Sequence, residues 1–224
     1  MCNLYALTKG QQALRELARA LDLGAVADRL GNLPVLSSLY PDAEAPIIGL
    51  ARGTAPNLIP GPMLSLARWG MPSPAFALAG KSVDRGITNI RNTASPHWRR
   101  WLAPQYRCLV PFTSFAEHVK TDTGFAPLWF APADDSLACF AGIATRWTGV
   151  RKKAEGEVTL TVFGFLTCEP NAEVAPHHPK AMPVILTTPD EQRRWLTADW
   201  ADAAALQRPL ADGGLRVMGF EGEE

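Results

Sequence analysis

The second residue of the chain is the first whose position suggests chemistry. The sequence opens MCNLYALTKG, so removal of Met1 would leave Cys2 with its amine and its thiol on neighbouring carbons. Such an aminothiol can attack an aldehyde through its amine and then close a ring through its sulfur, which no internal cysteine can do. The alternative is that position 2 holds a small residue at the start of a strand, and these ten residues alone favour that interpretation.

Three other residue types in the sequence are suited to proton transfer or hydrogen bonding. Glu117 follows an apolar strand, where partial burial would raise its pKa toward neutrality. His177 and His178 precede the strand-like run 182–186 and could move a proton near neutral pH. Asn89 lies in a basic loop and is either a turn residue or a neutral hydrogen-bonding group. Each has an ordinary structural alternative, so none of them defines a site alone.

The remaining cysteines give no sign of a metal site. Cys108, Cys139 and Cys168 each lie inside an apolar run, where a buried and inert thiol is the expected state. The four cysteines form no CxxC pair and show no zinc-type spacing. We therefore expect free thiols, no metal and no other cofactor.

Positive charge is concentrated in the middle of a chain whose net charge is zero. Residues 45–116 contain eight basic residues and one acidic residue, whereas residues 117–224 have a net charge of −6. Seven of the eight basic residues are arginines, which suit forked contacts with phosphate. Aromatic rings are interleaved with them: Trp69, His97, Trp98, Trp101 and Tyr106. Such a pattern fits either a single-strand nucleic acid groove or a solvated basic face over core tryptophans.

The elements that must position these residues are mostly strands. We predict strands at 106–119, 127–132, 137–147, 156–167, 182–187 and 214–220 from short apolar runs between Gly, Pro and Asp clusters. Amphipathic spacing predicts a helix over 10–21, and Thr188-Pro189-Asp190-Glu191 signals the start of another. These elements predict an α+β fold with a mainly antiparallel, barrel-like β-sheet core and flanking helices.

Length and composition indicate one packed domain over residues 1–224. Hydrophobic residues make up 47% of the chain and charged residues 20%. Residues 41–63 and 70–96 are rich in Pro, Gly, Asn and Ser, and we expect long ordered loops there that line a site. The apolar runs are too short to span a bilayer and the first twenty residues lack a signal-peptide core, so a cytoplasmic location is expected.

Five short motifs, taken in order along the chain, resemble one known family. They are Met-Cys at the N-terminus, ARWG at 67–70, N-x-R at 89–91, RCLVP ending in F-x-E at 107–117, and a histidine ahead of MPVIL at 182–186. One such motif is weak evidence, but five in order at sensible spacing are specific. The sequence thus resembles the SRAP domain proteins, named for SOS response-associated peptidases, from Met1 to about Leu186. Residues 187–224 lie outside the motifs and are expected to complete the domain with a helix and a strand.

The resemblance implies roles for particular residues. Its catalytic group maps onto Cys2, Asn89, Glu117 and His178. Its DNA-binding group maps onto Arg68, Trp69, Arg91, Arg99 and Thr167. The interval of eleven residues from Thr167 favours His178 over His177. Many family members begin Met-Cys-Gly-Arg, whereas this chain has Asn3 and Leu4, so a basic contact beside the cysteine is missing.

The function that the resemblance implies is the capture of abasic sites in single-stranded DNA. Cys2, freed of Met1, would form a covalent thiazolidine cross-link with the ring-opened sugar and protect the lesion, with self-removal of Met1 and weak lyase activity as accompanying reactions. The alternatives are a cysteine hydrolase acting on other substrates and a non-catalytic single-strand DNA-binding domain. Nothing in the sequence requires an oligomer, a small-molecule cofactor or a membrane, so a monomer is expected.

Overall fold

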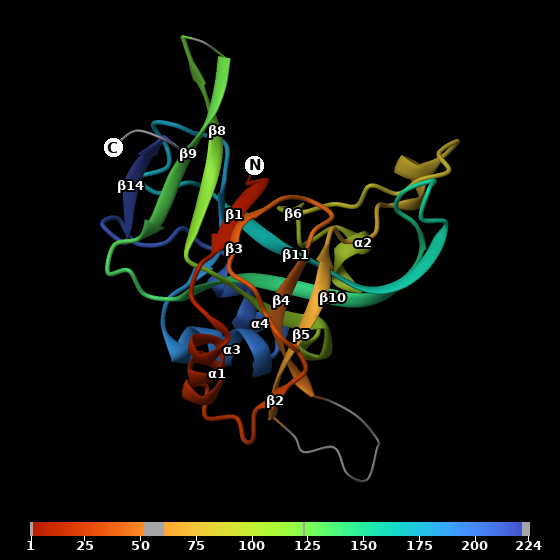
Figure 1. Ribbon diagram of the computed structural model, residues 1–224, viewed down its shortest axis with the longest axis horizontal. Coiled ribbons are helices and arrows are strands. Elements are labelled where there is room, and N and C mark those ends of the chain that lie inside the picture. Colours follow the sequence, from red (N-terminus) through yellow and green to blue (C-terminus); the bar gives the residue numbers. More distant parts are fainter. Residues whose placement is uncertain (1, 52–60, 123, 221–224) are drawn as a thin grey trace.

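A closed barrel of five strands forms the centre of the molecule (Figure 1). The computed structural model describes residues 2–51, 61–122 and 124–220. The barrel strands are β4 (Glu44–Ala51), β5 (Gly61–Trp69), β7 (Arg107–Phe112), β10 (Ala138–Val150) and β11 (Glu157–Cys168). Four of the five pairings are antiparallel. The fifth is a short parallel pairing of β5 with β11, through Val162 opposite Arg68 and Phe163 opposite Trp69, and it closes the barrel.

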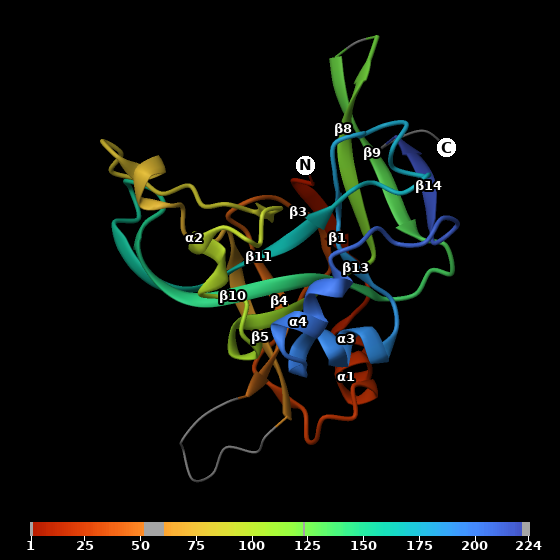
Figure 2. The ribbon, with the colours of Figure 1, turned by 180° about the vertical axis from the view of Figure 1, so that it is seen from behind.

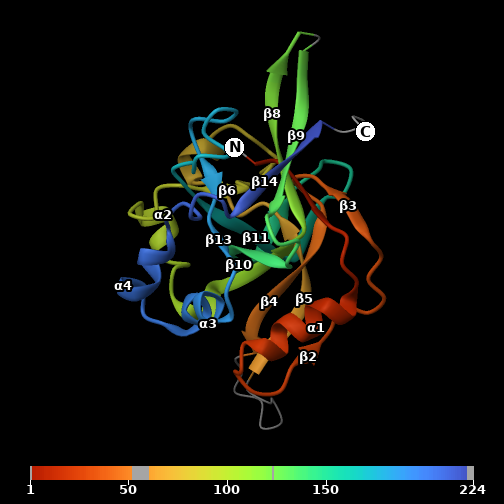
Figure 3. The same ribbon diagram turned by 90° about the vertical axis from the view of Figure 1, so that its left-hand side faces the viewer.

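A second sheet of five strands packs beside the barrel. Its order is β14 (Leu215–Phe220), β9 (Gly124–Pro132), β8 (Ser114–Thr121), β1 (Leu4–Leu7) and β3 (Leu36–Leu39), all antiparallel. The chain passes from the barrel to this sheet at Thr113, whose amide donates to the carbonyl of Ala6 at 2.8 Å. The β8–β9 hairpin projects beyond the rest of the molecule in every view (Figures 1 and 3). The N-terminal strand β1 is thus an interior strand, held on both sides.

Short strands complete the sheets near the ends of the barrel strands. They are β2 (Ala27–Asp28), β6 (Asn89–Ile90), β12 (Met182–Pro183) and β13 (Ile185–Leu186). Strand β6 pairs in parallel with β11, and β12 pairs with the end of β11. The second half of β11, residues 162–168, is buried on both faces, whereas the first half alternates between exposed and half-buried positions. Because β11 lies between other layers at this end, it can carry site residues on either side.

Helices cover the end of the barrel opposite the β8–β9 hairpin (Figures 1 and 2). The helices α1 (Gln11–Ala20), α3 (Pro189–Thr197) and α4 (Trp200–Ala203) lie there, while α2 (Pro96–Arg99) lies to one side. Trp195 of α3 fixes this packing, because its indole nitrogen donates to the carbonyls of Cys108 and Gly142 at 3.0 and 3.1 Å. None of the described helices is long and apolar enough to cross a membrane.

The predicted α+β fold with a mainly antiparallel, barrel-like core is confirmed. The predicted helix over 10–21 is α1, and the one signalled at 188–191 is α3, where Thr188 Oγ1 accepts from the Glu191 amide at 3.2 Å. The six predicted strand regions correspond to β7 through β14.

The prediction of a loop over 41–63 is wrong, because this region contains β4 and the start of β5. Proline is usually absent from the interior of a sheet, because it has no amide proton to donate, but Pro46 is an exception. It lies within the β4–β5 ladder opposite Leu66, in a strand that is buried from Ala45 to Ile48. Residues 52–60, which join β4 and β5, lie outside the described part of the chain. By contrast, residues 70–96 contain only the 3₁₀ turn Ala75–Leu78, β6 and the first residue of α2.

Candidate active site

Cys2 lies directly before β1, at the edge shared by the barrel and the second sheet. Its side chain is fully buried and its thiol donates to the carbonyl of Leu4 at 3.4 Å. Burial raises the pKa of the Cys2 thiol well above its usual range, and the nearby Glu117 carboxylate raises it further. The thiol is therefore held in its protonated form in the folded chain.

Asn89 reaches Cys2 from the opposite side of this edge. The parallel pairing of β6 with β11 sets Asn89 opposite Phe165. Its amide nitrogen donates to the carbonyl of Cys2 at 2.8 Å and lies 3.4 Å from Oδ1 of Asn3. Its own side-chain oxygen is buried and has no hydrogen-bond partner among the described residues. Asn89 thus fixes the backbone of residue 2 and keeps one acceptor for another group.

Glu117 comes to the site through the pairing of β8 with β1. Leu4 lies opposite Ala116 in this antiparallel ladder, so its continuation carries Asn3 and Cys2 toward Glu117. The side chain is only 1% exposed. Burial raises the pKa of the Glu117 carboxyl, and the positive charge of a protonated His178 opposes this rise. The predicted buried acid with a raised pKa is present, but Glu117 lies within β8 and not at the end of a strand.

His178 is the histidine that lies beside Glu117. Its Nε2 is 3.7 Å from a carboxylate oxygen of Glu117, and its Nδ1 contacts the carbonyl of Ala181 at 2.7 Å. Because a carbonyl only accepts, Nδ1 carries a proton and Nε2 is the nitrogen that can exchange one with the site. His177 is exposed and contacts the ring of Phe130 instead. The geometry therefore favours His178 over its neighbour.

Thr167 lies at the end of β11, two residues beyond the partner of Asn89. Its side chain is 1% exposed, and its hydroxyl has no hydrogen-bond partner in the described part of the chain. Its carbonyl accepts from Gln207 at 3.0 Å, and the same amide nitrogen donates to the carbonyl of Arg91 at 2.8 Å. Gln207 was not predicted as part of the site, because nothing in an Ala-rich C-terminal segment marks a residue that joins the ends of β6 and β11.

The two arginines predicted to contact phosphate at the site are on its surface. Arg91 follows β6 and its side chain is 39% exposed, but it is paired with the exposed Glu169. Arg99 is exposed at the end of α2, where its guanidinium donates to the carbonyl of Ala94 at 3.0 Å. A phosphate at Arg91 would have to displace Glu169, which is feasible because surface ion pairs are weak.

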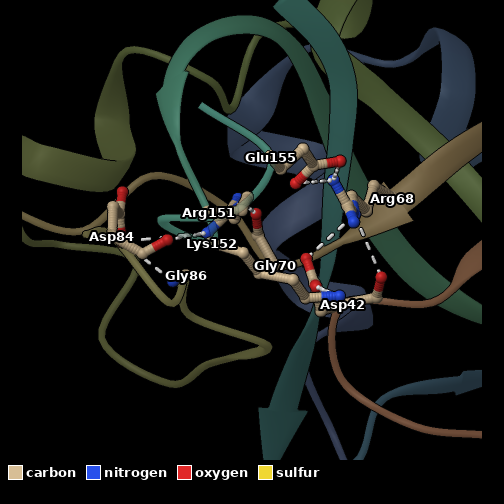
Figure 4. Close-up of polar contacts among 8 residues, drawn as sticks. All are labelled: Asp42, Arg68, Gly70, Asp84, Gly86, Arg151, Lys152 and Glu155. Atoms are coloured by element: carbon tan, nitrogen blue, oxygen red, sulfur yellow. Dashed lines mark hydrogen bonds and ion pairs between the residues drawn. The ribbon is translucent and has the colours of Figure 1, made fainter. Parts of the chain in front are cut away.

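Two of the predicted DNA contacts have side chains that are engaged inside the protein. Arg68 is held between carboxylates of Asp42 and Glu155, at 2.9 and 2.8 Å, and its side chain is 12% exposed (Figure 4). Trp69 is 1% exposed and stacks on Phe165 in the core. Its indole nitrogen lies 3.4 Å from the carbonyl of Thr88, directly before Asn89. Trp69 thus supports the site from below and Arg68 is neutralised, and contact of either residue with DNA stays a prediction.

Leu4 replaces the basic residue that many members of the resembled family carry beside the cysteine, and it is 1% exposed. Its side chain packs inward, so position 4 offers no surface for a charge. Asn3, the other departure, is exposed and approaches Thr88 and Asn89 at 3.4 Å. The described residues include no cluster of three or more His, Cys, Asp or Glu side chains that could hold a metal ion.

The fold and the site define an α+β barrel protein with a thiol, an amide, a carboxyl and an imidazole gathered at the start of the chain. The chain belongs to the SOS response associated peptidase (SRAP) family, whose model matches residues 1–218. The match extends beyond the motifs to include α3, α4 and most of β14. A comparison with curated proteins gives no significant match.

Solved structures share this fold across nearly the whole chain. A protein from Bordetella bronchiseptica is 22% identical with a TM-score of 0.72, covering 99% of this chain and 100% of its own. One from Bacteroides thetaiotaomicron is 19% identical with a TM-score of 0.72, covering 99% and 93%. A phage-related protein from Bordetella bronchiseptica is 20% identical with a TM-score of 0.64, covering 100% and 95%. At such identities the likeness establishes the fold alone.

Proposed function

We propose that this protein captures abasic sites in single-stranded DNA through Cys2 after removal of Met1. The observation that carries the proposal is the convergence of Asn89, Glu117 and His178 on the residue that would become the N-terminus. Asn89 binds the Cys2 carbonyl at 2.8 Å, and His178 lies 3.7 Å from Glu117, which acts electrostatically on the Cys2 thiol. A cysteine packed in the core for stability alone does not require these three polar groups around it.

The first step is attack of the Cys2 amine on the aldehyde carbon of the ring-opened sugar. The carbinolamine loses water and gives an imine. A terminal amine has an ordinary pKa of about 7.7 to 8.0, so a useful fraction is neutral near pH 7. Glu117, whose pKa is raised, retains a proton closer to neutrality than an exposed acid and can donate it to the departing hydroxyl.

The second step is addition of the Cys2 sulfur to the imine carbon. A carbon–sulfur bond forms, the thiol proton moves to the imine nitrogen, and a five-membered thiazolidine ring closes. Because the thiol is protonated in its buried setting, the closure needs a proton relay, and His178 can supply it through Nε2. The unpartnered Oδ1 of Asn89 suits a hydroxyl of the opened sugar, and Arg91 and Arg99 suit the adjacent phosphates.

Two accompanying reactions follow from the same groups. If ring closure fails, the imine permits β-elimination and strand cleavage, so weak lyase activity is expected. Removal of Met1 by the protein itself would use Cys2 as nucleophile, with Glu117 and His178 moving protons.

The test is a denaturing gel of the protein lacking Met1 after incubation with a single-stranded oligonucleotide containing one abasic site. We expect a band shifted by the mass of the protein, and its loss in Cys2→Ala. Cys139→Ala is the matched control, because it removes another fully buried thiol and should leave the band intact. Cys2→Ser should give an imine that is trapped only by reduction, since no thiazolidine can close.

Other outcomes would contradict the proposal. DNA binding without a covalent band would indicate a non-catalytic binding domain. Amide hydrolysis without either would indicate a cysteine hydrolase. A covalent band of wild-type intensity in Cys2→Ala would show that another residue reacts.

A further inference from the structure

A basic cavity lies outside the candidate active site and is lined by residues of the 70–88 segment and the β10–β11 turn. These two segments lie side by side in Figures 1 and 2. Its volume is about 850 Å³. The polar side chains that line it include Ser73, Lys81, Arg85, Arg151, Lys152 and Lys153. None of the described residues that line it is acidic. Neither the motifs nor the proposed chemistry at Cys2 uses this cavity.

The cations at the back of the cavity are neutralised by an internal network (Figure 4). Asp42 pairs with both Arg68 and Lys152, at 2.9 and 2.7 Å. Arg68 also pairs with Glu155 at 2.8 Å. The buried Arg151 lies 3.8 Å from the carboxylate of Asp84. Three cations are therefore balanced by three carboxylates within the network.

Three further cations lining the cavity are not balanced. Lys81, Arg85 and Lys153 are exposed, and none of them has an ion pair with another described residue. Their charges therefore create a local excess of positive potential in a concave surface. An anionic ligand with several charges matches this arrangement better than a single carboxylate.

The loop that carries two of these cations is held in place by Asp84. Its carboxylate is 6% exposed and accepts from the amide and hydroxyl of Ser73, at 2.9 and 2.6 Å, and from the amide of Gly86 at 2.8 Å. Arg151 adds a bond to the carbonyl of Asp84 at 2.9 Å. Lys81 and Arg85 thus flank a braced turn, which lowers the entropic cost of ordering them around a ligand.

An exposed aromatic residue directly precedes two residues that line the same cavity. Phe76 is 83% exposed in the 3₁₀ turn Ala75–Leu78, and the next two residues, Ala77 and Leu78, line the cavity. Cations that follow a phosphate backbone combined with an exposed ring that stacks a base are the features of a single-strand binding subsite.

The cavity is connected to the candidate active site by a short stretch of chain. Asn89 is the fourth residue after Arg85, which limits the distance between their α-carbons to about 14 Å. Nucleotides in one stacked strand are about 3.4 Å apart and extended ones are further apart, so about four nucleotides or fewer bridge this distance.

We propose that this cavity binds the backbone phosphates of single-stranded DNA a few nucleotides from the lesion, with one unstacked base on Phe76. The position of the strand rests on the proposed function, but binding at the cavity itself requires no lesion. The structure thereby assigns Lys81, Arg85 and Lys153 to strand binding and leaves the chemistry to the residues around Cys2.

The test compares two triple variants by fluorescence anisotropy on an undamaged single-stranded 15-mer over a range of salt concentrations. The first replaces Lys81, Arg85 and Lys153 by Gln, and the control replaces the exposed Arg19, Arg29 and Arg146 by Gln. Loss of three phosphate contacts should reduce the slope of log K against log salt by about 2, and weaken binding by about tenfold or more at 0.1 M salt. The control triple should keep the wild-type slope. Phe76→Ala should weaken binding about fivefold or more with the slope unchanged.

Further arms identify the occupant and separate this inference from the chemistry at Cys2. An abasic deoxyribose 5′-phosphate has no neighbouring nucleotides that could enter the cavity, so at saturating protein it should cross-link equally to wild type and the first triple variant. If the wild type forms no cross-link, abasic capture is contradicted. The salt dependence of binding to the undamaged 15-mer still tests the cavity in that case. An unchanged slope in the first triple variant, or an equal loss in the control, would overturn the proposed subsite. Binding of deoxyadenosine triphosphate that depends on the three cations, without an effect on the 15-mer, would assign the cavity to free nucleotides and also overturn it.

Discussion

Glu117 is a carboxyl group that the fold keeps away from water. It projects from β8 beside β1, is 1% exposed, and has its pKa raised by burial. Burying an acid whose charged form is poorly solvated costs stability, because the unfolded chain can ionise it freely. Such a cost is typical of groups whose protonation is used in a reaction.

Glu117→Gln should therefore stabilise the protein increasingly as pH rises. The pKa is higher in the folded than in the unfolded state, so the wild type loses stability from about pH 4.3 upward until the folded pKa is passed. Gln carries no charge, so the variant lacks this loss. For each pH unit by which the pKa is raised, the difference in free energy of unfolding grows by about 1.4 kcal/mol. Thermal melts of both proteins at pH 4.5, 6 and 8 measure it.

The matched control is Glu16→Gln on the exposed face of α1. Its melting temperature should differ from that of the wild type by the same small amount at every pH. If the difference in melting temperature between Glu117→Gln and the wild type is also the same at every pH, burial does not destabilise the charged form of this carboxyl. The cross-linking assay adds a second measurement, since loss of the acid should slow imine formation.

At this scale the sequence identifies residues better than it identifies their partners. Cys2, Asn89, Glu117 and His178 were found through motif order, and the structure brings them together. The neutralisation of Arg68 was not predictable, because Asp42 and Glu155 are distant in sequence and neither belongs to a motif. The burial of Trp69 was not predictable either, because a tryptophan next to an arginine fits a groove and a core equally well.

Among the elements, the turn over 84–86 has the most constrained backbone around the basic cavity. Gly86 has a φ of +78°, and a β-carbon built there would lie 2.2 Å from a guanidinium nitrogen of Arg151. The guanidinium occupies this space because it donates to the carbonyls of Gly70 and Asp84. The absent side chain at position 86 is thus what lets the β10–β11 turn pack against the 70–88 segment.

Gly86→Ala should lower the free energy of unfolding by about 3 kcal/mol, from the positive φ and the overlap with Arg151 together. In a chain of this length that corresponds to a loss of about 6 to 12 °C in melting temperature. Gly80→Ala provides the control, since Gly80 has a similar φ of +72° and nothing within 4 Å of its built β-carbon. It should lose only about 2 to 4 °C. Equal losses in the two variants would show that the guanidinium moves aside without cost.

Element prediction succeeded for the apolar runs that form β7 to β11, although β7 contains Pro111, and failed for β4, which lies in a segment rich in Pro and Gly. The runs that form β7 to β11 are rich in apolar and β-branched residues, so their sequences predict strands directly. In β4, the local signal of Pro46 was overridden by pairing on both sides, with β5 and β7. Such pairing depends on residues far away in the sequence, which a local pattern does not contain.

For the molecule as a whole, the decisive contact is the short parallel pairing of β5 with β11. It closes the barrel at Trp69, whose ring packs against Phe163 and Phe165 of β11 and against Tyr5 of β1. The Trp69 side chain thereby links the two strands that close the barrel, β5 and β11, to β1 of the second sheet. This closure also fixes the position of Thr88 and Asn89, because the Trp69 indole nitrogen donates to the carbonyl of Thr88.

Trp69→Ala should lower the free energy of unfolding by about 3 to 5 kcal/mol, as expected for removing a fully buried aromatic side chain. Its affinity for undamaged single-stranded DNA, measured well below the melting temperature, should stay within about twofold of wild type, because the ring is not available to a base. Trp101→Ala is the comparison, since Trp101 is only partly buried against the core, and it should cost less than half as much. A large loss of affinity in a folded Trp69→Ala protein would support the sequence-based prediction of a DNA contact.

The interior position of β1 also has a consequence for the order of events during translation. Strand β1 needs β8 as its partner, and His178 joins the site only after residue 178 has been made. At 5 to 20 residues per second, the segment that carries Cys2 waits roughly 9 to 36 seconds for that neighbour. During this interval the cysteine is open to any aldehyde or oxidant in the cell. The thiol of Cys2 is therefore exposed to solvent before it is buried, and the length of this exposure depends on how fast the rest of the chain is synthesised.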